Sequence, residues 1–539
     1  MQKAIINTEK RSVCNISFYF CATKLQLFIQ SLIQTQRIFI AYSFFLRLKM
    51  DMTAADKGKL RPEEVFECFS KVNQVPRPSK KEDKMIAFLM DFGLSLGLDT
   101  QKDATGNVLI RKPATPGYEN LETLVLQCHM DMVCEKNRDV DFNFETDAIQ
   151  TYVDGDWLKA KGTTLGADDG IGVAMCMAVL QSKQIEHGPI ECLFTRDEET
   201  GLTGAMGLEP GFVKGKFLIN LDSEDEGQIF VSCAGGARTT ATFSFREEAL
   251  PAGYFTIKVT VKGLTGGHSG DDINKKRANA NKMLARYLYR LMQKTDVRIV
   301  DIQSGGLHNA IPREGFAVIA VPEKDKELAR IELNLFAAEA EEEYARTEAN
   351  MQFLLETCTA GTTCLEPEVA ERLIFSLIAV FNGIEAMSQD LDWLVETSSN
   401  LASVRKEGDQ VVVTTSQRSS VSSKREYVSS MVRSTFRLAG AQAVTNEGYP
   451  GWKMNPDSAL LKLAKESYVQ LFNKEPEILA IHAGLECGLF SEKYPQLDMI
   501  SVGPTLRGVH SPDEKLLIPT VEMVWRHLLD MMKRIPQRR

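Results

Sequence analysis

The sequence predicts an α/β protein with a central, mostly parallel sheet and helices on both faces. Short apolar runs alternate with helix-like segments, and each run is followed at once by acidic or imidazole side chains. Apolar runs of this length are typical of strands that are covered on both faces. In open α/β sheets, ligands bind at the carboxyl ends of the strands. We therefore expect a polar site at one edge of the sheet.

Three apolar runs predict strands in the first part of the chain. They follow a stretch with helical periodicity from 61 to about 96. The run 121–128 ends in His129, 190–194 leads to Glu198 and Glu199, and 217–221 leads to Asp222. These strands are expected to lie in one sheet and to bring their terminal side chains together.

The pattern changes near residue 254 to alternating strands and amphipathic helices, and this character persists to about 440. Beyond it, the pattern again resembles the first part of the chain. The order predicts a discontinuous catalytic domain interrupted by an inserted α/β lid domain. The predicted parts are a poorly structured or spurious extension (1–54), the first catalytic segment (55–239), the lid domain (240–442) and the second catalytic segment (443–539).

The lid domain is predicted to consist of two similar halves. Segments 254–346 and 351–438 each contain a strand, a helix, two paired strands and a second helix. We expect the halves to pack as one extended domain. In the last catalytic segment, a helix at 458–472 precedes a strand at 478–481 that ends at His482, then a strand at 499–502 and a helix at 520–535.

Composition excludes several classes of function. A net charge of -9 provides no basic surface for nucleic acid. In the N-terminal extension, Lys24 and Arg37 interrupt any run long enough to cross a membrane. The 11 cysteines are scattered, several within apolar runs, which is typical of reduced thiols in a cytoplasmic protein.

The turn at 163–172 carries the adjacent carboxylates Asp168 and Asp169 between glycines, and an apolar run follows it. Two carboxylates held this close favour a bound cation, because like charges otherwise repel. The alternative is a helix N-cap, since an aspartate at a helix start accepts hydrogen bonds from free N–H groups.

The residues at the strand ends match the ligands of a metal centre. Mixed imidazole and carboxylate ligands without cysteine suit zinc, with Mn²⁺ or Co²⁺ as substitutes. Two histidines and three carboxylates exceed the needs of one tetrahedral ion, which predicts two ions sharing a bridging carboxylate. One carboxylate, Glu198, then remains as a general base. The candidate ligands are His129, Asp168, Glu199, Asp222 and His482.

Six motifs together resemble one known family. They are His-Met-Asp at 129–131, Gly-Ala-Asp-Asp-Gly-Ile-Gly at 166–172, Glu-Glu-Thr-Gly at 198–201, Asp-Ser-Glu at 222–224, Gly-Gly-His-Ser-Gly at 266–270 and Ile-His-Ala-Gly-Leu-Glu-Cys-Gly at 481–488. The sequence from about residue 55 onwards is similar to the aminoacyl-histidine dipeptidases, or cytosol non-specific dipeptidases. These belong to the dizinc carnosinase, carboxypeptidase-G and aminoacylase group.

The resemblance implies two Zn²⁺ per chain and a role for each ligand. His129 and Asp222 would hold the first ion, Glu199 and His482 the second, and Asp168 would bridge them. Asp131 would orient His129 through its far ring nitrogen, as metal-bound imidazoles commonly require. The resemblance also implies a cis peptide bond between Asp168 and Asp169. Asp169 departs from the family, in which Asn is frequent at this position.

The implied reaction is hydrolysis of Xaa-His and other unblocked dipeptides. A water molecule between the two ions would lose a proton to Glu198 and attack the peptide carbonyl, with His268 stabilising the oxyanion. The candidate substrate contacts are Asn309, Arg418, Gly484 and His510, with Arg313 as a further basic residue.

Several alternatives remain open. His268 in a glycine-rich turn and Asn309 in a β-turn also fit structural roles, and surface arginines are usually solvated. A related N-acyl amino acid deacylase or tripeptidase would share the ligands and the base, and a metal-free binding protein would have lost one of them. The expected partners are small dipeptides, with neither nucleic acid nor membrane; a homodimer is compatible with the sequence.

Overall fold

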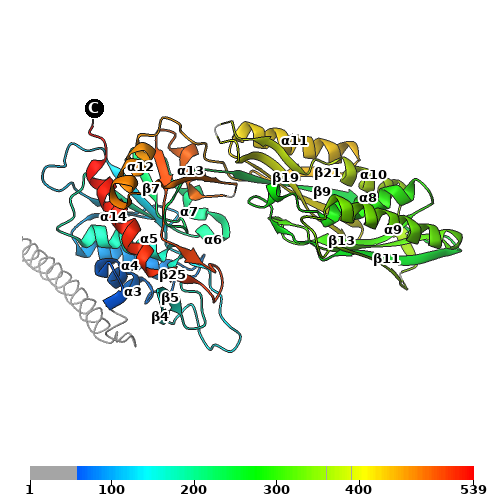
Figure 1. Cartoon of the computed structure of the whole chain (residues 1–539), viewed down its shortest axis with the longest axis horizontal. Coiled ribbons are helices and arrows are strands. Elements are labelled where there is room, and N and C mark those ends of the chain that lie inside the picture. Colours follow the sequence, from blue (N-terminus) through cyan, green and yellow to red (C-terminus); the bar gives the residue numbers. More distant parts are fainter. Residues whose placement is uncertain (1–57, 360, 390, 483, 539) are drawn as a thin grey trace, which may run out of the picture.

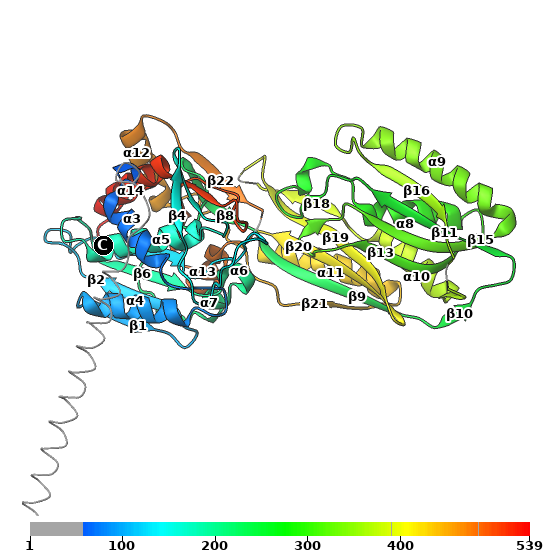
Figure 2. The ribbon, with the colours of Figure 1, turned by 90° about the horizontal axis from the view of Figure 1, so that it is seen from below.

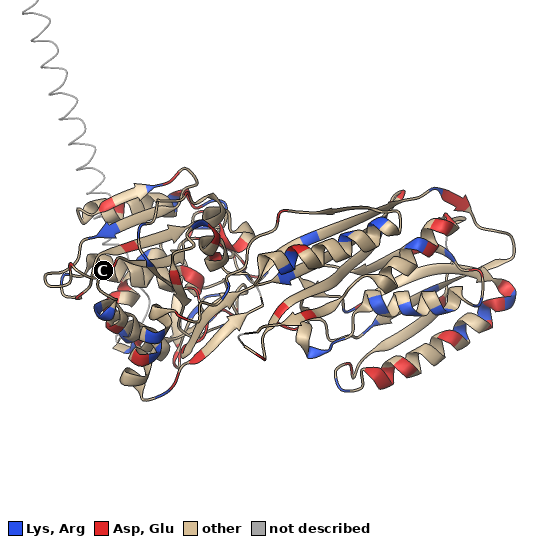
Figure 3. Cartoon of the chain, turned by 90° about the horizontal axis from the view of Figure 1, so that it is seen from above, with Lys and Arg blue, Asp and Glu red and all other residues tan. Residues whose placement is uncertain are grey.

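The computed structural model describes residues 58–538 except 360, 390 and 483. These residues form two bodies arranged end to end (Figure 1). The predicted extension 1–54 lies outside the described residues. Within the described part of the chain, no helix has the length and apolar character needed to cross a membrane. Lys and Arg are interspersed with Asp and Glu along both bodies (Figure 3).

The first body is built on an eight-stranded sheet whose central strands run parallel. β3 pairs in parallel with both β6 and β7, and β7 pairs in parallel with β23. At one edge β1 and β2 are antiparallel, and at the other β8 and β22 are parallel to each other. The order is β1 (Asp99–Lys102), β2 (Val108–Lys112), β6 (Ile190–Thr195), β3 (Leu124–His129), β7 (Phe217–Asn220), β23 (Asp498–Ser501), β8 (Gln228–Cys233) and β22 (Glu477–Ile481).

Helices cover both faces of this sheet because strand side chains alternate between the faces. In β3, Leu124 and Leu126 face one core and Val125 faces the other. The first core contains residues of α3 (Glu63–Val72), α4 (Asp83–Ser95), α5 (Ala167–Gln181), α12 (Ala459–Phe472) and α14 (Ile518–Arg534), and the second contains residues of α7 (Thr203–Gly207) and α13 (Glu486–Lys493).

The predicted helical stretch from 61 to 96 is two helices. α3 ends at Val72 and α4 begins at Asp83. Pro76 and Pro78 lie between them, and a proline can neither donate the helical hydrogen bond nor allow its predecessor the helical conformation. The intervening segment carries Arg77, which points into the body (1% exposed).

The second body, the lid domain, is one nine-stranded sheet covered by four helices that share a single core. In Figure 2 the strands of this sheet run roughly along the long axis of the molecule. The path is β16 (Gln352–Thr357), β11 (Tyr254–Lys262), β15 (Gly315–Pro322), β13 (Arg298–Gly305), β19 (Val395–Glu407), β20 (Gln410–Ser419), β9 (Gly235–Ser244) and β21 (Gln442–Thr445), with β18 (Gly383–Met387) beside β19. The helices are α8 (Ala280–Met292), α9 (Lys326–Glu343), α10 (Pro367–Ala379) and α11 (Ser422–Leu438), and the short ribbon β10 (Glu247–Ala249) and β17 (Thr363–Leu365) adds a margin.

The strand order of the lid domain is mirrored about its centre. β16-β11-β15-β13 forms one half and β21-β9-β20-β19 the other, and the halves meet where β13 and β19 pair antiparallel. The predicted start of the second half at 351 is wrong, because β16 pairs with β11 and completes the first half. β9 supplies the corresponding strand of the second half. We propose lid limits near 240 and 442, which fall within β9 and at the first residue of β21.

A small sheet places two loops of the first body next to each other. Its order is β24 (Leu506–Arg507), β25 (Lys515–Leu517), β5 (Trp157–Ala160) and β4 (Thr151–Asp154). β25 pairs antiparallel with β5, so the loop that follows β5 and the loop that precedes β25 leave the same end of the pair. The first loop leads to Asp168 and the second contains His510.

Candidate active site

Three of the predicted ligands converge at the carboxyl ends of the parallel strands. His129 is the last residue of β3, Asp222 follows β7, and Asp168 lies in the first turn of α5. His129 Nε2 is 3.1 Å from Asp168 Oδ1 and 3.3 Å from Asp222 Oδ1. The parallel pairing of β3 with β7 aligns the strand ends that carry His129 and Asp222, and the start of α5 adds Asp168.

Glu199 and His510 form the second part of the cluster. Glu199 lies in the short helix α6 (Glu198–Gly201) after β6. His510 Nε2 is 2.9 Å from Glu199 Oε2 and 3.2 Å from Asp168 Oδ2. The two oxygens of Asp168 therefore face different imidazoles, which is the geometry expected of a bridging carboxylate. Glu198 also belongs to this cluster, with a carboxylate oxygen close to ligand atoms of His129 and Glu199.

Asp131 lies behind the cluster, fully buried. Its Oδ1 is 3.5 Å from His129 Nδ1 and accepts a hydrogen bond from the Glu198 N–H (3.0 Å). Its Oδ2 accepts one from the Glu199 N–H (3.3 Å). One carboxylate thus contacts an imidazole from β3 and the start of the helix that carries both glutamates, as expected of a group that orients ligands.

The chemistry of the cluster fits a pair of divalent cations. The cluster contains four carboxylates and two imidazoles. Glu199 Oε1 is buried and has no hydrogen-bond partner among the described residues. Burial, and the negative charge of Asp168 and Glu199 beside it, raise the pKa of Asp222 to about 7 although His129 opposes this. Hydrogen bonds to Asp168 and Glu199 raise the pKa of His510 to about 11. Cations of total charge +4 would balance four carboxylates and so make their burial tolerable.

Glu198 has the environment of a proton acceptor. Burial raises the pKa of its carboxyl group well above the usual value, and nearby Asp222, Glu486 and Glu199 raise it further, whereas His129 lowers it. Its backbone is fixed by Asp131, so the position of its carboxylate depends on a rigid support.

The two adjacent carboxylates have different roles. Asp169 accepts hydrogen bonds from backbone N–H groups, as an N-cap residue does, whereas Asp168 lies in the metal-ligand cluster. Asp169 Oδ1 accepts a hydrogen bond from the Gly172 N–H (3.1 Å) and Oδ2 one from the His129 N–H (3.3 Å). A Cβ at residue 172 would lie 2.2 Å from Asp169 Oδ1, so this close approach requires glycine. The Asp168–Asp169 peptide bond is cis, as the family resemblance implied.

His482, expected as a ligand of the second ion, belongs to none of the clusters of potential metal ligands among the described residues. It follows β22 at the edge of the sheet, and its Nε2 is 2.7 Å from Ser398 Oγ of lid strand β19. Burial lowers the pKa of His482 to about 3, and nearby Arg418 adds to this effect. The structure brings His510 to Glu199 instead, although the sequence suggested His510 only as a substrate contact.

Arg418 and His268, both from the lid domain, form a second cluster together with Tyr449. Arg418 Nη2 is 3.3 Å from His268 Nε2, and Nη1 donates to the Tyr449 hydroxyl oxygen (3.2 Å). Because a guanidinium only donates, His268 accepts at Nε2. Its Nδ1 is 3.0 Å from Asp271 Oδ2 and accepts a hydrogen bond from the Asp271 backbone N–H (3.3 Å). We call Arg418, His268 and Tyr449 the Arg418 cluster.

Arg418 is only 6% exposed, and its Nε has no hydrogen-bond partner within the part of the chain that the structure describes. In the described part of the chain, no carboxylate lies within ion-pair distance of its guanidinium. A buried guanidinium of this kind can accept a further anion, because burial of a charge is costly without a counter-charge. Asp271, which contacts His268 rather than the guanidinium, is a carboxylate within electrostatic range of Arg418.

Of the other predicted substrate contacts, Gly484 and Asn309 lie next to residues of this cluster, whereas Arg313 is exposed. A Cβ at residue 484 would lie 2.7 Å from the Tyr449 ring, so Gly484 packs directly on that residue. Asn309 contributes its backbone carbonyl, which accepts from the Ser269 N–H (2.8 Å) next to His268. β12 (Gly267–His268) pairs with β14 (Ala310–Ile311) at this point.

One segment connects the Arg418 cluster with the metal-ligand cluster. It begins with His482 and Gly484 and continues into α13 with Glu486. Glu486 Oε2 accepts hydrogen bonds from Gln127 Nε2 (2.6 Å) and Thr195 Oγ1 (2.8 Å). These two residues lie on the strands that lead to His129 and to Glu198.

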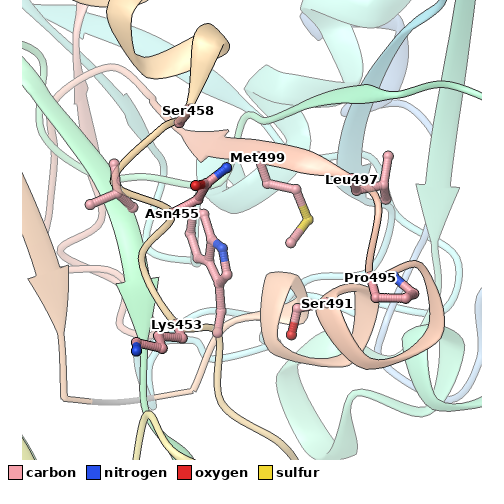
Figure 4. Close-up of a pocket in the computed structure, with 9 residues that line it drawn as sticks. Lys453, Asn455, Ser458, Ser491, Pro495, Leu497 and Met499 are labelled. Atoms are coloured by element: carbon pink, nitrogen blue, oxygen red, sulfur yellow. The ribbon is translucent and has the colours of Figure 1, made fainter.

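Sequence reasoning missed three buried charged residues around the site: Arg77, Glu486 and Glu514. Glu486 and Glu514 lie within stretches already singled out, four residues after His482 and His510 respectively. A cavity of about 170 Å³ elsewhere in the first body is lined by Trp452, Lys453 and Met499, among others (Figure 4). None of the cluster residues lines it.

The fold and the clustered ligands together define a metal-dependent hydrolase. Residues 125–534 match the model of Peptidase family M20/M25/M40, and the chain belongs to this family.

The chain is 42% identical to the cytosol non-specific dipeptidase of Escherichia coli strain K12, over 89% of this chain and 99% of the relative. The crystal structure of aminoacylhistidine dipeptidase from Vibrio alginolyticus superposes with a TM-score of 0.84 at 43% identity, covering 90% of this chain and 99% of that one. A tripeptidase from Staphylococcus aureus shares the fold at a TM-score of 0.51 and 17% identity, over 89% of this chain and 99% of that one. The resemblance noted from the six motifs is confirmed.

Proposed function

We propose that the chain is a dizinc dipeptidase that hydrolyses unblocked dipeptides, Xaa-His among them. The observation that carries this proposal is Arg418, a buried guanidinium with no carboxylate within ion-pair distance among the described residues. It lies near His482, in the segment that leads to Glu486 and so to the surroundings of Glu198. A dipeptide carries a free carboxylate one residue beyond its scissile bond. An anion site for this carboxylate would therefore select short substrates.

In the proposed site, His129 and Asp222 would hold one ion, Glu199 and His510 would hold the other, and Asp168 would offer one carboxylate oxygen to each. This assignment replaces His482 with His510, and it is supported by the contacts of His510 Nε2 with Asp168 and Glu199. Asp131 orients His129 and the start of α6. Zinc suits these nitrogen and oxygen donors, and Mn²⁺ and Co²⁺ are substitutes.

The chain's own residues have distinct tasks in the proposed reaction. Bound divalent cations would supply Lewis acidity for the scissile carbonyl and lower the pKa of water. The Glu198 carboxylate accepts a proton from the attacking water and passes it to the leaving amine. The Arg418 guanidinium binds the substrate carboxylate. His268, which lies in the same cluster as Arg418, is the proposed group that would stabilise negative charge on the carbonyl oxygen.

A cytoplasmic location is part of the proposal. The nine cysteines in the described part of the chain are all free, although Cys128 and Cys176 have sulfur atoms only 3.9 Å apart. Unpaired, mostly buried thiols are typical of a reducing compartment.

The test is hydrolysis of a substrate panel after chelation and re-addition of single metals. Free dipeptides should be cleaved, whereas C-terminally amidated dipeptides and N-acetyl amino acids should be cleaved poorly. Activity should be lost on chelation and return with Zn²⁺, Mn²⁺ or Co²⁺. Preferential cleavage of N-acetyl amino acids or tripeptides would favour the deacylase or tripeptidase alternative.

A further inference from the structure

One carboxylate from the C-terminal part of the chain holds the turn that carries Asp168. Glu514 Oε2 accepts hydrogen bonds from the N–H groups of Leu165 (2.7 Å) and Gly166 (2.9 Å). Glu514 Oε1 accepts from those of Ala167 (2.7 Å) and Asp168 (3.3 Å). The side chain is only 2% exposed, so water does not compete for these bonds. Four successive N–H groups around one anion fix the path of the backbone.

Arg77 holds the same turn from the other side. Its Nη2 donates to the Gly166 carbonyl oxygen (2.5 Å) and its Nη1 to the Asp131 carbonyl oxygen (3.0 Å). Gly166 has a φ of 66°, and a Cβ there would lie 2.5 Å from Arg77 Nη2. The peptide groups around Gly166 are therefore bound at both their N–H and C=O ends. The buried Arg77 guanidinium is in turn stabilised by the negative charge of Glu514.

Glu514 and His510 lie on the same loop, between β24 and β25. The carboxylate thus joins the His510 loop to the Asp168 turn, at the place where β25 pairs with β5. Neither Glu514 oxygen is directed at the metal-ligand cluster, since both are occupied by backbone N–H groups.

We propose that Glu514 is a positioning residue that sets the separation between Asp168 and His510, and with it the metal site that these residues form with Glu199. The inference rests on the proposed metal centre. It assigns to the chain a residue that determines metal affinity without contacting metal or substrate.

The substitution Glu514→Gln tests the inference with almost no change in shape. The amide NH₂ group faces two backbone N–H groups, so two acceptor bonds are replaced by contacts between donors. Residues that support metal ligands typically contribute 10–100-fold to metal affinity, and we expect a loss of roughly that size here.

Glu191→Gln is the matched control. Glu191 is also only 2% exposed, and its Oε2 accepts from the N–H groups of Lys214 (2.8 Å) and Gly215 (2.9 Å). It lies near the start of β6, at the end of the strand opposite Glu198. Both variants should lose thermal stability, but only Glu514→Gln should change metal binding.

The measurement is titration of the chelated full-length protein with Zn²⁺ against a competing chelator, with the Co²⁺ absorption spectrum as a second readout. Glu514→Gln should bind at least one Zn²⁺ roughly 10–100-fold more weakly than wild type and show altered Co²⁺ bands, because the His510 ligand is displaced. Wild-type Zn²⁺ affinities and Co²⁺ bands in Glu514→Gln would show that Glu514 only stabilises the fold, and would overturn the inference.

Glu514→Asp decides the question if Glu514→Gln does not fold. Aspartate keeps the charge but is one methylene shorter, so a smaller loss of Zn²⁺ affinity is expected; wild-type affinity would again overturn the inference. Failure of the wild-type protein to bind Zn²⁺ would refute the proposed metal centre itself, together with the inference. That outcome is distinguishable because it appears without any substitution.

Discussion

Substitution of Arg418 by Gln separates recognition of the substrate carboxylate from the chemistry of hydrolysis. Gln keeps much of the length and one donor group but removes the charge. Tyr449 and His268, the two neighbours of the guanidinium, remain in place. We therefore expect a defect restricted to substrates that carry a free carboxylate.

The size of the defect follows from the bonds that Arg418 can offer. A guanidinium can form two charge-assisted hydrogen bonds with a carboxylate, each contributing about 1.5–3 kcal/mol, and Gln retains one neutral bond of about 0.5–1.5 kcal/mol. The net loss is about 3 kcal/mol, which corresponds to a decrease in kcat/KM of roughly 150-fold.

The assay compares each free dipeptide with its C-terminal amide in wild type and variant. In wild type the free dipeptide should be strongly preferred. In Arg418→Gln the preference should fall by roughly two orders of magnitude, while the slow hydrolysis of the amide stays nearly constant. Arg433→Gln is a suitable control, because Arg433 lies on α11 of the same domain and is already paired with Glu426 (2.8 Å).

An equal loss of activity on the free dipeptide and on the amide would refute the reasoning. Arg418 would then stabilise the fold or the transition state rather than bind the substrate carboxylate. Zn²⁺ content should be unchanged in the variant, which distinguishes this failure from damage to the metal centre.

Four further outcomes are expected. Glu198→Gln should keep its bound metal but lower kcat by at least roughly 100-fold, and a fall in metal content would assign Glu198 as a ligand instead. His510→Ala should lose one ion whereas His482→Ala keeps both; the opposite result on metal analysis would restore the original assignment. A mixture of His268→Ala and Glu198→Ala chains should stay inactive, because His268 contacts Arg418 of its own chain. Activity on mixing would show that His268 of one subunit acts in the site of another. Burial lowers the pKa of His527 from 6.5 to about 4. Between these two pH values the imidazole is protonated in the unfolded chain but neutral in the folded one, so the folded state loses stability as the pH falls. In urea unfolding, the free energy of unfolding should fall between pH 7 and pH 5 by about 2 kcal/mol more in wild type than in His527→Gln. An equal pH dependence of the two proteins would contradict this.

The sequence was sufficient to predict the cluster on the parallel strands. His129, Glu198 and Asp222 follow apolar runs directly, and parallel pairing of those runs forces their ends to one edge. The same rule suggested His482, since it also follows an apolar strand. β22 is an edge strand, however, and its end faces lid strand β19 rather than the central strands.

His510 could not be assigned in this way because a loop carries it, not a strand end. Its position depends on the pairing of β25 with β5, which joins segments more than 300 residues apart. Arg77 and Glu514 were missed for a related reason. A buried charge is recognised by its partners, and these are backbone groups that have no signature in the sequence.

The interrupted order of the first body has a consequence for synthesis of the protein on the ribosome. Strands β3, β6 and β7 emerge first, but β23, which pairs with β7, and the loop with His510 follow only after the whole lid domain. At about 5–20 residues per second, the roughly 290 residues between Asp222 and Glu514 take about 15–60 seconds to translate. The lid strands pair among themselves, so they can fold during this interval without the rest. A nascent chain therefore carries His129, Asp168 and Glu198 for most of its synthesis before the loop with His510 is made.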